Sequence, residues 1–306
     1  MNKSPILFLI FNRPESTLIV FNKIREYKPS KLYIAADGPR IDNINDISLC
    51  SQTREIVKSI DWKCEVQYLL REENKGCKIA VSEAINWFFN HEEYGIIIED
   101  DCLPDISFFD FCTNMLEKYI NNNNIFAIGG NCFLPKKYRS IESSYFFSKH
   151  VEIWGWATWR RAWNLYDVNL TNYPSEIELL KNSNYFDNID NFQHWNNIFN
   201  KLYTNQIDTW DYQWVYTVWV NDGLTILPTK NLVKNIGFNQ FATHTKTENK
   251  FFENFNIEPI TFPLSHPLEI KRNKTNDKWI DNNVNGFNKN IFRKTASKIK
   301  NFLKNV

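Results

Sequence analysis

The fold of this chain is decided by the stretch Ile96-Ile97-Ile98-Glu99-Asp100-Asp101. A short, continuous run of β-branched apolar residues is typical of a strand that is buried on both faces of a parallel sheet. Three carboxylates follow this run directly. Because ligands bind at the carboxyl ends of the strands in open parallel sheets, the stretch predicts a buried strand whose end carries chemistry.

The residues on either side of this stretch alternate between apolar runs and segments with helical spacing. We expect strands at residues 5–11, 32–36, 64–70, 96–98 and 125–128, and helices at 14–27, 49–60, 75–90 and 105–119. In the first helix, Leu18, Phe21 and Ile24 are predicted to form the apolar stripe. This alternation predicts an α/β fold with a mostly parallel sheet and helices on both of its faces.

The composition allows a large core and disfavours some classes of protein. The chain has 306 residues, of which 43% are hydrophobic and 16% are aromatic. Aromatic side chains build cores, and they also form flat surfaces on which sugar rings can stack. The net charge of +1 argues against a general nucleic-acid-binding protein, which usually has a basic excess.

The cysteines and the apolar runs bear on where the protein works. No run of 18 apolar residues occurs, so no transmembrane helix is expected, and the short run at 5–11 is interpreted as a strand and not as a signal peptide. No CxxC pair occurs, and several cysteines lie in apolar runs, so we expect reduced core thiols and no zinc site. These features predict a cytoplasmic protein; the cysteines are Cys50, Cys64, Cys77, Cys102, Cys112 and Cys132.

Three regions are expected along the chain. Residues 1–130 form the regular α/β half, and residues 131–250 form an aromatic-rich half of the same domain. Residues 251–306 form a C-terminal extension. Its last part, 287–306, has six Lys or Arg and no acid, with apolar residues on one face of a predicted helix. This helix either contacts anionic lipid at the inner face of the cell membrane or packs on its own domain.

The acidic stretch is a candidate cation site. Three neighbouring carboxylates repel one another unless a cation lies beside them, and Mn²⁺ and Mg²⁺ prefer carboxylate and phosphate oxygens. The alternative is a solvated acidic turn. A second carboxylate, Asp37, ends the strand at 32–36 before Gly38; it either contacts a base or ribose, or stabilises its own turn.

The loop of residues 71–78 is a candidate phosphate site. It joins a predicted strand to a predicted helix and carries Arg71, Lys75 and Lys78. Cations and helix N-termini both favour phosphate. An ordinary charged loop is the alternative.

The aromatic half contains candidates for catalysis and acceptor binding. Asp211 lies among aromatic residues and is interpreted either as a general base or as a helix cap. Trp154, Trp156 and Trp210 are interpreted as a surface for an acceptor sugar, with core packing as the alternative. His244, in a polar loop, could reach back to a metal or a diphosphate.

Together these motifs resemble the GT-A fold glycosyltransferases, in a bacterial branch similar to the inverting N-acetylglucosaminyltransferase that starts complex N-glycan branching. The resemblance runs from about residue 4 to about residue 245, and Glu99 stands where the common Asp-X-Asp motif has its first Asp. The matching segments are 11–15, 36–40, 73–76, 98–101, 154–159, Trp210-Asp211 and 235–244.

The resemblance implies a role for each matching residue. Asp101 would bind Mn²⁺ or Mg²⁺, and Asp211 would be the general base. His244 would contact the metal or the diphosphate. The residues that would bind the donor are Asn12, Arg13, Asp37, Glu99 and Asp100.

The implied function is transfer of a sugar from a nucleotide-sugar donor to a glycan or a lipid-linked glycan. The alternatives are a sugar nucleotidyltransferase, which usually has a glycine-rich loop where this chain has Asn12 to Glu15, and a non-catalytic carbohydrate-binding protein. The hypothesis requires Asp101 to be available to a cation. An Asp101 held in a structural ion pair would contradict it.

Overall fold

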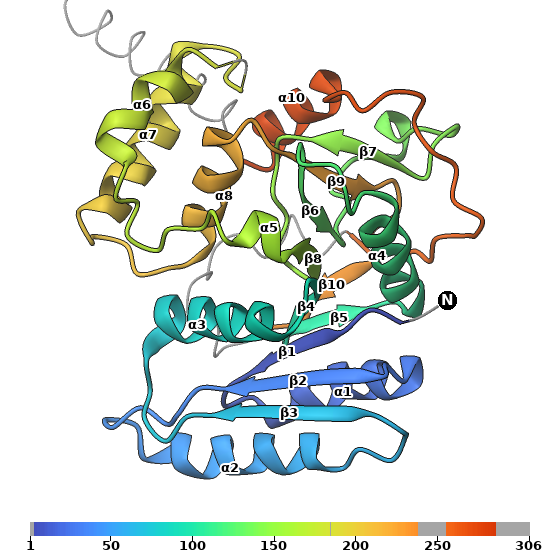
Figure 1. The fold of residues 1–306 in the computed structure, drawn as a ribbon, viewed down its shortest axis with the longest axis vertical. Helices are drawn as coiled ribbons and strands as arrows, with labels where there is room; N and C mark the ends of the chain where they lie inside the picture. Colours follow the sequence, from blue (N-terminus) through green and yellow to red (C-terminus); the bar gives the residue numbers. More distant parts are fainter. Residues whose placement is uncertain (1–2, 184, 238–254, 286–306) are drawn as a thin grey trace, which may run out of the picture.

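The chain folds around one mixed sheet with helices on both faces (Figure 1). A computed structural model describes residues 3–183, 185–237 and 255–285. Among these residues, eight strands form the main sheet in the order β3-β2-β1-β4-β8-β6-β9-β7, and β5 and β10 form a two-stranded sheet. The strands are β1 (Ile6–Ile10), β2 (Lys31–Ala36), β3 (Glu65–Leu70), β4 (Tyr94–Glu99), β5 (Cys102–Pro104), β6 (Ile125–Gly129), β7 (Tyr145–Ser148), β8 (Trp156–Trp159), β9 (Leu224–Pro228) and β10 (Val233–Asn235).

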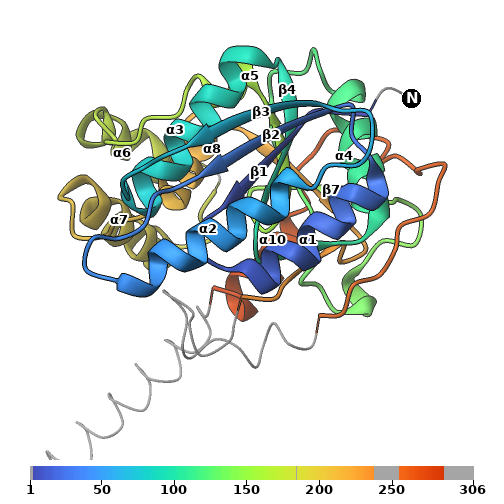
Figure 2. The ribbon, with the colours of Figure 1, turned by 90° about the horizontal axis from the view of Figure 1, so that it is seen from below.

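The helices divide between the two faces of this sheet. Figure 2 shows α1 and α2 side by side on one face, and α3 lies on the other. The helices are α1 (Pro14–Tyr27), α2 (Ile44–Lys58), α3 (Gly76–His91), α4 (Ile106–Lys118), α5 (Arg160–Trp163), α6 (Tyr173–Lys181), α7 (Ile189–Tyr203), α8 (Asp211–Val220) and α10 (Lys274–Asn283), with a 3₁₀ turn at Lys136–Tyr138. The predicted α/β fold, a Rossmann-like arrangement with a mostly parallel sheet between helices, is confirmed.

Strand β1 shows why the apolar runs are continuous. All five of its residues are buried, and successive side chains alternate between two core clusters. Phe8 packs with the cluster that includes residues of α1 and α4, whereas Leu7 and Leu9 pack with the cluster of α3 and α8. A strand covered on both faces has no position for a polar side chain, which explains the run at 5–11.

The order of the strands is not evident from the sequence. Strands β1, β2, β3 and β4 are parallel neighbours, whereas β8 runs antiparallel between β4 and β6. Residues after 130 therefore complete the sheet that the first half begins. Because β8 is antiparallel, its first residues lie at the same edge as the last residues of β4, with Ile97 paired to Trp156.

Two details of the expected core are wrong. Leu18 is 46% exposed, because α1 packs on the sheet through Val20, Phe21 and Ile24 and turns Leu18 to solvent. Cys77 is exposed at the start of α3, although all six cysteines are unpaired, as expected. No helix in the described part of the chain is long and apolar enough to cross a membrane.

A buried ionic cluster attaches α10 to the segment that follows β7. Lys149 Nζ lies 2.6 Å from Asp281 Oδ2, and both side chains are 1% exposed. Asp277 accepts a hydrogen bond from Ser148 Oγ at 2.5 Å and pairs with Arg272. These contacts hold the C-terminal helix against the strand that leads into the aromatic segment 151–159.

We predict that Asp281→Ala lowers the free energy of unfolding by about 3–5 kcal/mol, because it leaves the Lys149 ammonium buried without its partner. The double variant Lys149→Met/Asp281→Leu should recover much of this loss. Chemical denaturation measures both effects. As a control, Glu178→Ala breaks an exposed pair with Lys181 and should change stability by less than about 1 kcal/mol. A loss below about 1 kcal/mol for Asp281→Ala would contradict the role given to this cluster.

Candidate active site at the carboxyl ends of the parallel strands

The three acids lie where β4 ends, beside the end of β1. Glu99 is the last residue of β4 and is paired in register with Leu9 of β1. Asp100 is buried, and its Oδ2 accepts a hydrogen bond from the backbone N–H of Phe11 at 3.0 Å. The loop after β1 and the loop after β4 therefore meet, as expected for neighbouring parallel strands.

Arg13 is the cation that pairs with these acids. It caps the start of α1, and its Nη1 lies 3.2 Å from Asp100 Oδ1 and 2.6 Å from Asp101 Oδ2. If the ion pair between Arg13 and Asp101 were a permanent part of the fold, it would contradict a cation site at Asp101. The Arg13 side chain, however, is 35% exposed.

One guanidinium does not balance three carboxylates. Burial raises the pKa of Glu99, and the charges of Asp101 and Asp100 raise it further, against the opposing effect of Arg13. Burial likewise raises the pKa of Asp100, although Arg13 lowers it. The protein therefore holds excess negative charge at this edge, which either protons or a second cation must offset.

The two residues that follow β10 pack against Asp101. The backbone N–H of Ile236 donates to the Asp101 carbonyl at 2.7 Å. A Cβ atom added at Gly237 would lie 2.3 Å from Asp101 Oδ2, so only glycine fits beside this carboxylate. The predicted His244 follows seven residues later and lies outside the described residues.

Asp37 stabilises the loop before α3. Its Oδ1 accepts hydrogen bonds from the backbone N–H groups of Gly38 at 2.9 Å and Lys75 at 3.0 Å. Its Oδ2 accepts one from Asn74 Nδ2 at 2.9 Å. The carboxylate thus occupies the N-terminus of α3, where the sequence predicted a phosphate. The alternative reading of Asp37 as a residue that stabilises its own turn fits these contacts.

The predicted phosphate-binding cations are not gathered at the acid cluster by any contact within the described residues. Arg71 donates to the carbonyl of Ala80 and pairs with Glu83 at 3.1 Å. Lys78 is buried, and its Nζ lies 3.5 Å from Asn205 Oδ1. Lys75 is exposed and lies 3.6 Å from Glu73. These three side chains therefore stabilise the loop of residues 71–78 and its contact with Asn205, which follows α7.

Asn12 positions the loop after β1. Its Nδ2 donates to Asp46 Oδ1 at 2.8 Å, and the same carboxylate pairs with Arg40 at 2.6 Å. Asp46 is fully buried at the start of α2, and the Arg40 side chain lowers its pKa. The sequence reading missed this cluster, since an Asp in the first turn of a helix has no distinctive pattern.

Asp211 is brought to the same edge from the second half of the chain. It is the first residue of α8, and its Oδ1 accepts hydrogen bonds from Thr209 Oγ1 and from the backbone N–H of Tyr212. Its Oδ2 accepts none from the described residues. The charge of Asp211 contributes to the raised pKa of Glu99, so the two carboxylates lie within electrostatic range of each other.

Two of the three predicted acceptor-binding tryptophans are core residues. Trp156 is fully buried, Trp210 is 2% exposed, and their rings stack with centroids 5.7 Å apart. Trp163 and Trp214 pack around them. Rings covered in this way present no face to a sugar, so the prediction is corrected for Trp156 and Trp210. Trp154 is partly buried and lies edge-on to Phe133 at 5.6 Å.

Glu152 is a further acid that the sequence analysis does not single out. It lies in the segment between β7 and β8, and its side chain makes no hydrogen bond or ion pair with the described residues. A Cβ atom at Gly129, the last residue of β6, would lie 3.1 Å from Glu152 Cβ. Burial alone raises the pKa of Glu152 to about 8, yet the residue keeps partial exposure. This combination indicates a recessed carboxyl group that is neutral at pH 7.

Comparisons with known proteins give only distant similarities. No protein-family model and no curated protein match the chain. HddC from Yersinia pseudotuberculosis is similar with 8% identity and a TM-score of 0.30, over 52% of this chain and 77% of HddC. Its complex with GMP-PN gives 10% identity and a TM-score of 0.31, over 51% and 77%.

The third structure is the 4-diphosphocytidyl-2C-methyl-D-erythritolsynthase from Anaerococcus prevotii. It has 10% identity and a TM-score of 0.33, over 63% of this chain and 84% of that protein. Similarity at this level carries no argument about what this chain binds or does.

We predict that Glu152 makes the stability of the protein depend on pH. Because its pKa is raised on folding, its stabilising contribution is fully present below its unfolded value of 4.5 and is lost as pH rises through about 8. Thermal unfolding between pH 5 and pH 9 should show Glu152→Gln less sensitive to pH than the wild type. Glu178→Gln, at an exposed position on α6, is the matched control. Equal pH profiles for wild type and Glu152→Gln would contradict the prediction.

Proposed function

We propose that this chain is a metal-dependent, inverting glycosyltransferase that transfers a sugar from a nucleotide-diphosphate sugar to a glycan or lipid-linked glycan. The observation that supports it is the meeting of Glu99, Asp100 and Asp101 with Asp211 at the carboxyl ends of the strands, with one arginine among four acids. The GT-A resemblance of the motifs supports the same reading. Residues 1–130 would then hold the donor and residues 131–250 the acceptor.

The residues at this edge fit a divalent cation. The side chain of Glu99 makes no hydrogen bond or ion pair with the described residues, and the acids outnumber Arg13. Within residues 3–183, 185–237 and 255–285, no three side chains form a ready-made metal cage. Mg²⁺ and Mn²⁺ sites commonly use one or two carboxylates together with substrate phosphates, which matches Asp101 as a ligand. When bound, the cation would neutralise charge on the departing diphosphate.

The side chains of the protein would supply positioning and proton transfer. Asp211 Oδ2 accepts no hydrogen bond from the described residues, so it is available to take the proton of an acceptor hydroxyl. Thr209 and the Tyr212 N–H hold Oδ1 and thereby orient the carboxylate. Arg13 would exchange its contact with Asp101 for a contact with the diphosphate and stabilise the charge that develops there.

A sugar nucleotidyltransferase is the second candidate. An enzyme of this kind would also place phosphates at this sheet edge. In this chain the loop after β1 has no glycine, and its Arg13 contacts the acids. The two candidates differ in their products, a nucleoside diphosphate for the transferase and pyrophosphate for the nucleotidyltransferase.

We predict that Asp211→Asn lowers turnover by about 10²–10⁴-fold, because it removes the proposed base. Donor binding should stay within about twofold, since Asp211 faces the acceptor. Release of nucleoside diphosphate in the presence of acceptor measures turnover, and a thermal shift with the donor measures binding. Asp208→Asn, in the loop before α8, is the matched control. A near-wild-type rate for Asp211→Asn would exclude this residue as the base.

We predict that Mn²⁺ binds at Asp101 in competition with Arg13. Asp101→Asn should abolish the Mn²⁺-dependent thermal shift produced by the preferred nucleotide. Arg13→Gln should strengthen the binding of Mn²⁺ alone, measured by electron paramagnetic resonance of the free ion, because the competing guanidinium is gone. Weaker Mn²⁺ binding by Arg13→Gln would show that the ion pair with Asp101 is structural, and the transferase proposal would fail.

The donor and the membrane contact need separate experiments. A thermal-shift screen of UDP-, GDP-, CMP- and dTDP-sugars with and without Mn²⁺ identifies the nucleotide, and a non-catalytic carbohydrate-binding protein would respond to none of them. Peripheral attachment to anionic lipid is proposed for residues 287–306, which lie outside the described residues. Co-sedimentation with liposomes, with and without this segment, tests it.

A further inference from the structure

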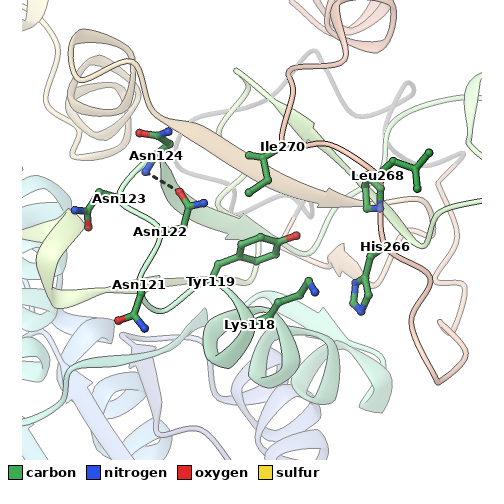
Figure 3. A pocket seen from close by; sticks show the side chains of 10 residues that line it. Lys118, Tyr119, Asn121, Asn122, Asn123, Asn124, His266, Leu268 and Ile270 are labelled. Atoms are coloured by element: carbon green, nitrogen blue, oxygen red, sulfur yellow. Dashed lines mark hydrogen bonds between the residues drawn. The ribbon is translucent and has the colours of Figure 1, made fainter.

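A cavity lies at the edge of the sheet opposite the candidate active site. Its volume is about 620 Å³, and it is formed by the end of α4, the turn at residues 121–124 and the segment 266–270 (Figure 3). The turn leads into β6, which runs parallel to β9, and the backbone N–H of Leu224 at the start of β9 donates to Asn124. The cavity is therefore at the amino ends of these strands, whereas the acids lie at the carboxyl ends.

The lining of this cavity is rich in amides and has no carboxylate. Four consecutive asparagines, 121–124, line one side. Each amide offers both a hydrogen-bond donor and an acceptor, which matches the hydroxyl groups of a sugar. Asn122 Oδ1 accepts the backbone N–H of Asn124 at 3.0 Å, and this contact holds the turn in shape.

Lys118 and His266 bring a charge and a second polar group to the opposite side. Figure 3 shows their side chains close together, reaching in from α4 and from the C-terminal segment. Lys118 makes no ion pair with a residue in the described part of the chain. Burial and the charge of Lys118 lower the pKa of His266, so the imidazole is neutral at pH 7. Its Nδ1 lies 3.0 Å from the hydroxyl of Tyr145, which anchors the ring.

The rest of the lining is apolar and exposed. Leu268 is fully exposed, and Ile270 is 45% exposed. In Figure 3 the Ile270 side chain points toward the ring of Tyr119, which is itself almost buried. Large aliphatic side chains at full exposure gain free energy when a ligand covers them. A sugar ring has an apolar C–H face and a polar rim, and this lining offers a partner to both.

We propose that this cavity is a second saccharide-binding site, separate from the active site, which binds an oligosaccharide that carries a carboxylate. The amides of residues 121–124 bind hydroxyl groups, Leu268 and Ile270 pack on a ring face, and Lys118 pairs with the carboxylate. The volume lies within the range of small-ligand sites in proteins, about 300–1,000 Å³. A nucleotide fits less well, because the lining has no exposed aromatic ring for a base.

This site goes beyond the proposed transfer reaction and does not depend on it. If the transferase proposal also holds, a glycan bound here would keep its free end near the protein and raise its effective concentration at the active site. Binding at the cavity needs neither nucleotide nor metal. Failure of one proposal is thus distinguishable from failure of the other.

The test measures binding by titration calorimetry with α-1,4-digalacturonate, its neutral counterpart α-1,4-galactobiose, and inorganic phosphate, without nucleotide or metal. The wild type should bind digalacturonate about tenfold more tightly than galactobiose. Lys118→Met should remove this difference, and Leu268→Ser should weaken both saccharides at least threefold. Both side chains are exposed, so the variants should keep the wild-type melting temperature.

Matched controls are Lys201→Met on α7 and Leu179→Ser on α6, which change exposed residues of the same kinds elsewhere. Neither should affect binding, and Asp211→Asn should bind as the wild type does. Absence of saccharide binding would overturn the proposal. The proposal would also be overturned if phosphate displaced digalacturonate while Leu268→Ser bound both saccharides as the wild type does. That result would describe a simple anion site at Lys118.

Discussion

The rest of the site depends on negative charge that the fold concentrates at one edge of the sheet. Strand β4 is buried on both faces and ends in Glu99, so this acid and the two that follow it, Asp100 and Asp101, have little solvent around them. Arg13 offsets one charge, and burial together with the charge of the neighbouring carboxylates raises the pKa values of Glu99 and Asp100. A site under this electrostatic load favours any ligand that brings positive charge.

The packing of the tryptophans explains how Asp211, which lies 110 positions after Asp101 in the sequence, comes to this edge of the sheet. Trp156 of β8 stacks on Trp210, and Trp214 of α8 packs on both Trp156 and Trp163. This block of rings fixes the start of α8, and with it Asp211, against the sheet. The tryptophans thus contribute to the site through rigidity. Under the proposed function, their effect on ligands would pass through the position of Asp211, because their own faces are covered.

The two ends of the strands carry different kinds of side chain. The carboxyl ends carry acids and backbone donors, whereas the amino ends near β6 carry amides, Lys118 and exposed aliphatic side chains. The C-terminal segment is attached to the sheet and lines the cavity. Its helix α10 is attached through Lys149 and Asp281 to the segment that follows β7, and its residues 266–270 form one wall of the cavity.

The sequence by itself determined the elements of the first half and the position of the acids, because these features are local. A continuous apolar run requires a buried strand, and the residues after it must lie at the strand's carboxyl end. Only the tertiary structure decided that β8 enters the sheet antiparallel between β4 and β6, and that Trp156 and Trp210 are core residues. It also decided that Asp37 occupies the N-terminus of α3. Each of these depends on a partner at least 27 residues away, and hydrophobic periodicity does not carry information about such partners.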